Sequence, residues 1–198
     1  LSPWKVVFHN VKITQERNDK GELKVTYETP KGTITTRVVY TPQMLRDGIV
    51  LYAHKEHAIK SYEDYDAAAY IFENAEVIPT YEKYAEYREN YIGSRGVAVA
   101  LSAMWASAGH YLIKELMSFE NFYLERFDDP EAMQDVARRL HPFCDKLFQA
   151  AVNSPAEVIL SGANYDFMFT TPDMIEEYVV DELKRQSDIA HGMGKFIA

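Results

Sequence analysis

Cysteine is almost absent from this chain of 198 residues, which carries only Cys144. A single cysteine excludes an intramolecular disulfide and is typical of proteins from a reducing cytoplasm, which is the location we expect. The chain also lacks any apolar run of the roughly twenty residues that a membrane helix needs, so we expect no membrane association.

Positive charge is scarce as well. The chain has 21 Lys and Arg against 30 Asp and Glu, which gives a net charge of -9. This balance argues against a nucleic-acid surface and against unaided binding of a polyanionic substrate. An apolar content of 47% and a charged content of 26% are ordinary for a globular protein, and the length is enough to bury a substantial core.

The most informative stretch is the C-terminal segment 155–198. An apolar run at 157–160 leads into the small-residue turn 161–163, and a capped helix then leads to a second apolar run at 195–198. Strand, loop, helix and strand in about this length predict a βαβ unit. Thr171 and Pro172 are typical of a helix start, and Ile175, Val179 and Leu183 predict its apolar face.

Three polar residues follow the first strand of this unit: Asn164, Tyr165 and Asp166. Side chains placed directly after a parallel strand face the crevice at the carboxyl edge of the sheet. We therefore expect Asn164 and Asp166 to face a pocket. The alternative is that their side chains only satisfy the backbone of the loop, and the residues alone leave both accounts open.

A second strand and loop precede this unit. The run 96–101 has no polar residue, as a buried parallel strand requires, and Trp105, His110 and Tyr111 follow it. Right-handed crossovers place the strands side by side, so both loops should share one edge. The long helix between the strands starts at Asp129-Pro130 and has an apolar face of Met133, Val136, Leu140, Phe143, Leu147 and Val152.

Residues 4–40 alternate between apolar and polar side chains and contain turn signals at 18–21 and 30–32, which predicts an antiparallel β-meander. We divide the chain into this meander at 1–45, an insertion or flap, and an α/β domain at 46–198. The meander is either a flap over a site or a plain surface element, that is, a surface sheet or a dimer-contact element, and we favour the second account.

Two weaker patterns have ordinary explanations. His54 and His57 could share a helix face and bind a metal, but no third ligand is near, so a solvated charged segment at 41–60 is the better interpretation. Cys144 could be a nucleophile only in an electropositive setting, and a small buried residue inside a helix fits better. His110 is either a catalytic group or a buried histidine with satisfied hydrogen bonds.

Several segments resemble the uroporphyrinogen decarboxylase superfamily, in particular its branch of methylcobamide:coenzyme M methyltransferases. They are EVILSGANYD (157–166), TTPDMIEEYV (170–179), HGMGKFIA (191–198), YETPKGTITTR (27–37), KSYEDYDAAAYI (60–71) and FENFYLERFDDPEAM (119–133).

The resemblance implies a fold: a (β/α)₈ TIM barrel, of which this chain would supply a central, partial βαβαβ segment preceded by the meander. It also implies zinc and a corrinoid as cofactors of the full-length protein. The His-x-Cys zinc motif of the methyltransferases and the arginine-rich signature of the decarboxylases do not occur here, so we expect no metal ligands within this chain.

By resemblance, Asp166, Asn164 and Tyr111 would be catalytic residues, and Trp105 would bind substrate. His110 and Tyr165 are added to the substrate-binding residues on their chemistry and their position in the two loops, not on the resemblance. The implied function is methyl transfer between a donor, a cobamide and a thiol-type acceptor. The alternatives are uroporphyrinogen decarboxylation and a non-catalytic binding or assembly role. We expect activity from the complete protein and none from residues 1–198 alone. The partners would be a small-molecule substrate, a corrinoid protein, and either a second copy or the remaining barrel strands.

Overall fold

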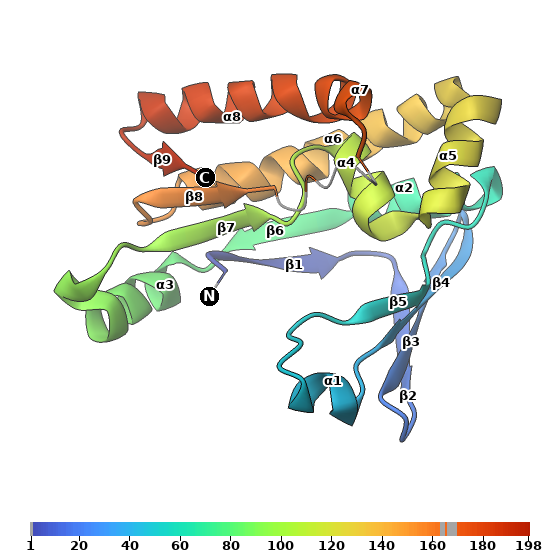
Figure 1. The fold of residues 1–198 in the computed structure, drawn as a ribbon, viewed down its shortest axis with the longest axis horizontal. Coiled ribbons are helices and arrows are strands. Elements are labelled where there is room, and N and C mark those ends of the chain that lie inside the picture. Colours follow the sequence, from blue (N-terminus) through green and yellow to red (C-terminus); the bar gives the residue numbers. More distant parts are fainter. Residues whose placement is uncertain (1, 163–164, 166–169) are drawn as a thin grey trace. The chain divides into compact units, whose positions relative to one another are not determined.

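The computed structural model describes residues 2–162, 165 and 170–198 (Figure 1). The chain is mixed α/β and forms two compact units. The first, here called the parallel-sheet unit, contains residues 1–7, 75–111 and 137–198. The second, the antiparallel-sheet unit, contains 8–74 and 112–136. The division at residues 45 and 46 is a different partition of the chain and stays a prediction.

Three parallel strands form the main sheet of the parallel-sheet unit: β7 (Val99–Ala103), β8 (Val158–Ser161) and β9 (Phe196–Ile197), in the order β7-β8-β9 (Figure 1). The predicted βαβ unit is therefore confirmed. The crossover helices are α6 (Pro130–Val152) and α8 (Asp181–Gly192). Because the strand order follows the chain order, right-handed crossovers place both helices on the same face of the sheet.

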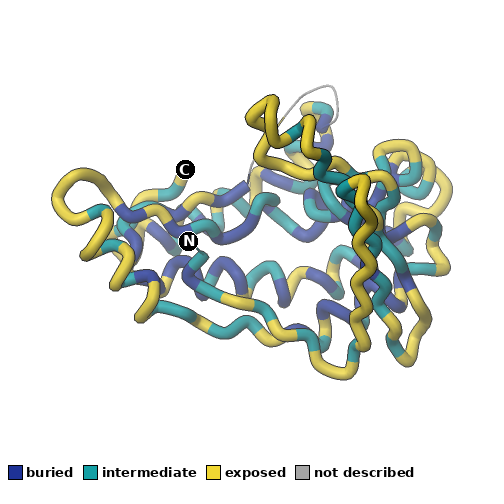
Figure 2. Tube along the Cα trace, turned by 90° about the horizontal axis from the view of Figure 1, so that it is seen from below, coloured by how far each residue is buried: buried dark blue, intermediate teal, exposed yellow. Residues whose placement is uncertain are grey.

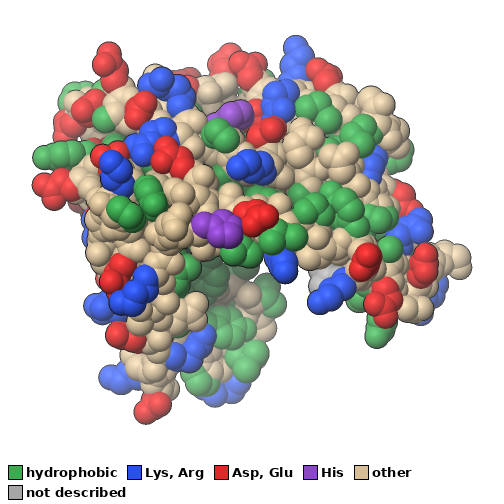
Figure 3. All heavy atoms as spheres, turned by 180° about the vertical axis from the view of Figure 1, so that it is seen from behind, with side chains coloured by type: hydrophobic (Ala, Val, Ile, Leu, Met, Phe, Trp, Pro, Cys, Tyr) green, Lys and Arg blue, Asp and Glu red, His purple; other side chains and the backbone are tan. Residues whose placement is uncertain are grey.

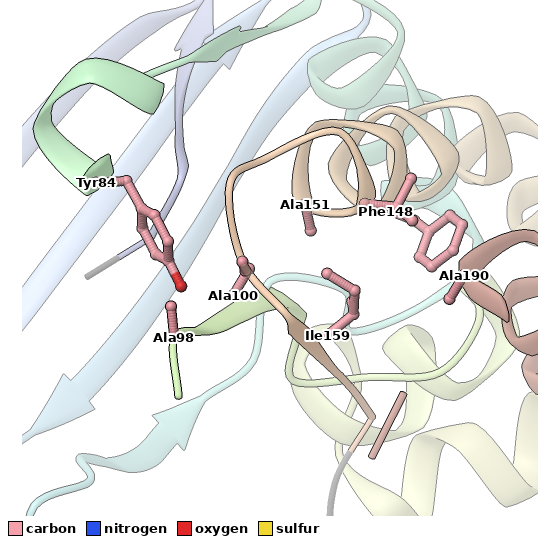
Figure 4. Packing of buried hydrophobic residues seen from close by; sticks show 9 residues of the cluster. Tyr84, Ala98, Ala100, Phe148, Ala151, Ile159 and Ala190 are labelled. Carbon is pink, nitrogen blue, oxygen red and sulfur yellow. The ribbon is translucent and has the colours of Figure 1, made fainter. Parts of the chain in front are cut away.

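The helix-covered face of this sheet is built from small side chains. Ala98, Ala100 and Ile159 are fully buried there. Figure 4 shows Ile159 among Phe148 and Ala151 of α6 and Ala190 of α8. Alanines on β7 let the helices approach closely, and the larger Phe148 and Ile159 fill the space between the layers.

The other face of the sheet is apolar but partly open. Residues that alternate with the buried ones point there, and Val99, Leu160 and Phe196 keep 44%, 37% and 69% of their surface exposed. Figure 2 shows the buried, intermediate and exposed classes along the trace. Val99 pairs with Val158, and Val158 with Phe196, so these side chains form a row across three strands.

Two further strands, β1 (Trp4–Phe8) and β6 (Ala75–Pro79), make a separate two-stranded sheet. The sequence places residues 4–8 in the meander, and that prediction is wrong. The Trp4 indole N–H donates to the carbonyl of Leu101 at 3.0 Å. The helix after β6 is α3 (Tyr81–Tyr87), continued by a π-helical turn, η2 (Arg88–Ile92), and a 3₁₀ turn, η3 (Gly93–Arg95).

The antiparallel-sheet unit contains the predicted meander. Its strands β2 (Lys12–Arg17), β3 (Glu22–Thr29), β4 (Gly32–Val39) and β5 (Ala53–Glu56) pair in that order. The β2–β3 turn requires glycine, because Gly21 has a φ of +79° and a Cβ there would lie 2.3 Å from the Tyr40 oxygen. Strand β5 lies within the segment 41–60, for which the sequence predicts a solvated charged stretch and no strand.

Short helices complete this unit. They are α1 (Pro42–Arg46), the 3₁₀ turn η1 (Tyr62–Asp64), α2 (Tyr65–Glu73), the π-helical turn η4 (Leu112–Leu116) and α5 (Phe119–Asp128). Ile59 forms a parallel bridge with Met117, and both are fully buried. The sheets of two, four and three strands seen in the described ranges do not make a closed barrel.

The long helix α6 has the apolar face that the sequence predicts, since all six predicted positions are buried. The helix before β9 differs from its prediction. It consists of α7 (Pro172–Ile175), the π-helical turn η5 (Glu176–Val180) and α8, and its buried residues are Met174, Val179, Gln186 and Ala190. Thr171 precedes the helix, but its side chain makes no capping hydrogen bond.

Acidic and basic side chains are interspersed with apolar ones on the face shown in Figure 3. This mixture agrees with a chain that has both charge signs and a moderate excess of acid. Within the part of the chain that the structure covers, no helix combines the length and the hydropathy of a transmembrane span.

Candidate functional site

The loops after β7 and β8 start at the same edge of the parallel sheet, because the two strands are neighbours and run in the same direction. The β7 loop leads into the short helix α4 (Ala108–Tyr111). Trp105, His110 and Tyr111 belong to this segment, and Tyr165 belongs to the β8 loop. Asn164 and Asp166, also predicted site residues, lie outside the described residues.

Trp105 and Tyr111 stack on each other. Their ring centroids are 3.7 Å apart and the planes differ by 16°. The backbone of Tyr111 is held by its N–H, which donates to the Ser107 carbonyl at 2.9 Å and closes the first turn of α4. The two predicted residues therefore form one stacked aromatic pair, here called the aromatic wall.

His110 and Tyr165 connect the two loops. Their rings stack with centroids 5.4 Å apart and an interplanar angle of 24°. The Tyr165 hydroxyl lies over Gly162, whose φ is +79°, and a Cβ at that glycine would be 1.8 Å from the hydroxyl oxygen. Burial raises the pKa of Tyr165, so its hydroxyl stays protonated at neutral pH.

His110 is buried, with 2% of its surface exposed. Its backbone N–H donates to Ser107 Oγ at 3.1 Å, and its Nδ1 accepts from the Ala106 backbone N–H at 3.0 Å. A backbone N–H can only donate, so Nδ1 must hold a lone pair. His110 is therefore a neutral imidazole that carries its proton on Nε2.

Cys144 of α6 lies close to Trp105. Burial raises the pKa of the Cys144 thiol to about 12, although the Trp105 indole acts in the opposite direction. In the described part of the chain the indole Nε1 has no well-aligned acceptor, so its contact with the sulfur is weak. A thiol in this state is a packing group and not a nucleophile, as the sequence favours.

Two residues at this edge were not predicted. Ser161, the last residue of β8, donates a short hydrogen bond to Gln186 of α8. Gln186 Nε2 in turn donates to the Ala106 carbonyl at 3.1 Å. The only signal in the sequence was a glutamine that falls, seven residues after Val179, on the apolar face of its helix.

The histidine pair of the sequence forms a separate cluster in the antiparallel-sheet unit. The His54 and His57 rings stack at 4.4 Å, and both contact Glu115: His54 Nε2 lies 3.1 Å from the carboxylate, and His57 Nδ1 lies 3.0 Å from the carbonyl. Strand β5 carries His54, so a shared helix face is wrong. No group of three His, Cys, Asp or Glu within the described ranges is arranged to hold a metal ion.

No family model, curated protein or solved structure matches this chain. Function is therefore inferred from the motif residues, the strand topology and the geometry of the site.

Proposed function

We propose that this chain is the central part of a uroporphyrinogen decarboxylase-like enzyme, a partial TIM barrel, and that the complete protein transfers a methyl group between a donor, a cobamide and a thiol-type acceptor in the cytoplasm. Within it, the β7 and β8 loops bind and orient the small organic substrate. The observation that carries the proposal is the stacking of His110 on Tyr165, which joins loops from two adjacent parallel strands.

The position of these loops supports a substrate site. In open and closed parallel α/β sheets, ligands bind outside the carboxyl ends of the strands. The aromatic wall of Trp105 and Tyr111, both partly exposed, gives this edge a weakly polar lining, and the neutral His110 is buried and stacks on Tyr165. Asn164 and Asp166 would add an amide and a carboxylate from the β8 loop.

The charge of the loops favours methyl transfer over the alternative, decarboxylation of a tetrapyrrole. A tetrapyrrole with several carboxylates needs cationic groups to hold it. Neither the segment 103–111 nor the segment 161–171 contains Lys or Arg. These loops therefore suit a substrate that is neutral or cationic around the reacting group.

Zinc and a corrinoid are part of this proposal for the complete protein. The described residues do not offer a zinc ligand set, so we assign no step to a metal held by them. The tasks that remain for this chain are to enclose the substrate with aromatic side chains and to present hydrogen-bonding groups from the β8 loop.

The test is a methyl-transfer assay on the complete protein with methylcobalamin and 2-mercaptoethanesulfonate, alongside a decarboxylation assay with uroporphyrinogen and a zinc measurement. We expect methyl transfer and bound zinc. The Asp166→Ala variant should lose at least about tenfold in rate, typical for a lost orienting group, with an unchanged unfolding midpoint. Asp188→Ala, an exposed site on α8, is the matched control and should keep full activity.

Three other outcomes are informative. Decarboxylation without methyl transfer would replace this function by the decarboxylase alternative. An Asp166→Ala variant that only unfolds would assign that residue a structural role. A complete protein that is inactive in both assays would favour the non-catalytic binding or assembly role.

A further inference from the structure

Gln186 of α8 is buried, with 4% of its surface exposed, although its side chain is a primary amide. A buried amide is costly unless each of its polar atoms has a hydrogen-bond partner. Here Nε2 donates to the Ala106 carbonyl at 3.1 Å and to Glu182 Oε1 at 2.9 Å, and Oε1 accepts from Ser161 Oγ. Both amide N–H groups and the oxygen are thus used.

The partners of Gln186 allow only one orientation of its amide. The Ala106 carbonyl and the Glu182 carboxylate are acceptors only, so the NH₂ group must face them. The amide oxygen therefore faces Ser161, and the Ser161 hydroxyl is the donor. A flipped amide would place oxygen against two other oxygens.

Gln186 bridges the two loops of the candidate site. Ser161 ends β8 immediately before the turn at Gly162, and Ala106 lies in the loop after β7. The helical side of the bridge is itself fixed, because Arg185 bonds to Glu182 at 2.7 Å and to Asp145 of α6 at 2.7 Å. One side chain thus holds both loops against two anchored helices.

Ala106 connects this bridge to His110. Its carbonyl is held by Gln186, and its N–H donates to His110 Nδ1 at 3.0 Å. The Ala106 carbonyl and N–H belong to the two peptide planes that meet at its Cα, so the two bonds together restrain φ and ψ of Ala106 and favour the backbone conformation that aims the N–H at His110. That N–H keeps the His110 proton on Nε2.

We propose that Gln186 is the positioning residue of this edge: it locks the β7 loop to the β8 strand end and, through Ala106, sets the tautomer of His110. This role of Gln186 follows from hydrogen-bond geometry alone and is the same whichever reaction the complete protein performs. A leucine at position 186 has a similar volume but leaves Ser161 Oγ and the Ala106 carbonyl without this partner.

The test is nitrogen NMR of the imidazole side chains in the histidine-labelled chain. His110→Asn identifies the His110 signals by their loss. In the wild type we expect His110 as the Nε2–H tautomer at neutral pH. In Gln186→Leu we expect a mixture of tautomers or an Nδ1–H form, whereas Gln134→Leu, the same exchange at an exposed helical position, should leave the His110 spectrum unchanged.

The Ser161→Ala variant distinguishes the effect of the Gln186–Ala106 hydrogen bond from a general loss of stability. It removes one donor but keeps the Gln186–Ala106 bond, so the tautomer should persist even if the protein is less stable. A folded Gln186→Leu variant with an unaltered His110 spectrum would overturn the proposal. If Gln186→Leu does not fold, the nitrogen spectrum of the wild type is still a test. A protonated His110, or one with its proton on Nδ1, at neutral pH would contradict the proposed arrangement.

Discussion

Gly109 is required by its neighbour and not by its own backbone conformation. A Cβ at this position would lie 2.5 Å from Cδ1 of Tyr178, which packs on it from η5. We predict that Gly109→Ala destabilises the protein by about 1–3 kcal/mol, because the tyrosine ring must shift within a packed layer. Urea unfolding monitored by circular dichroism gives the value.

The pair Gly109 and Tyr178 should be coupled. Tyr178→Ala opens the space that the new methyl group needs, so the double variant should lose less stability than the sum of the two single losses. Additive losses of stability would mean that the Tyr178 ring does not restrict the size of the side chain at position 109.

His57 makes the stability of the antiparallel-sheet unit depend on pH. Burial is the main reason that its pKa lies below the ordinary 6.5; His54 and Lys60 act in the same direction, and Glu115 opposes them. Below pH 6.5 His57 therefore binds a proton in the unfolded chain, whereas in the folded chain it stays neutral until the pH reaches its lower pKa. We predict that stability decreases as the pH is lowered from 6.5 toward the folded pKa, and that His57 contributes no pH dependence above 6.5.

His57→Asn is the control for this titration. The asparagine amide can replace Nδ1–H as the donor to the Glu115 carbonyl but does not titrate. Denaturant unfolding between pH 8 and pH 5 should show a smaller decrease for the variant than for the wild type. Equal slopes would assign the pH dependence to other groups.

Part of the candidate site could be located from the sequence because its residues are close along the chain. Trp105, His110 and Tyr111 follow one strand within a few positions. To place them in one loop it was enough to predict where that strand ends. The role of Gln186 could not be predicted, because it bonds to a residue 80 positions away. Contacts at that separation depend on how helices pack, which a local pattern does not contain.

At the level of elements, the alternation along β7 decides which substitutions are tolerated. Ala100 is fully buried under the helices, whereas Val99 points to the open face. We predict that Ala100→Leu costs about 1–3 kcal/mol through overpacking. Val99→Leu places the same leucine side chain on the open face and should change the free energy of unfolding by no more than about 0.5 kcal/mol. Chemical unfolding of both variants compares the two faces, and equal costs would contradict the assignment.

The helix after β8 shows why helical periodicity was only partly informative. The pattern Ile175, Val179 and Leu183 assumes an uninterrupted α-helix. The π-helical turn Glu176–Val180 adds a residue to one turn, so the buried positions are Met174 and Val179, five apart. A period of 3.6 cannot anticipate this step, because a π-turn is stabilised by tertiary packing and has no simple sequence signature. The uninterrupted helix α6 followed its predicted face throughout.

At the level of the whole molecule, the open face of the parallel sheet is the feature that most favours binding to another chain. Its row of Val99, Val158 and Phe196 and the neighbouring Leu160 are apolar and partly exposed. Apolar surface of this kind, beside the short strand β9, favours association. We predict that the chain self-associates as its concentration rises, and that sedimentation velocity detects this at micromolar concentrations.

Threonine substitutions on this face test whether it is responsible. Val99→Thr combined with Leu160→Thr places β-branched side chains, which suit strands, at both positions but reduces the apolar area, so the dissociation constant should rise by about tenfold or more. Leu124→Gln removes an exposed leucine from α5 and should leave association unchanged. If the wild type sediments as a monomer at every concentration, the open face does not drive association. If the Leu124→Gln variant dissociates as readily as the double variant, association arises from apolar exposure in general and not from this sheet.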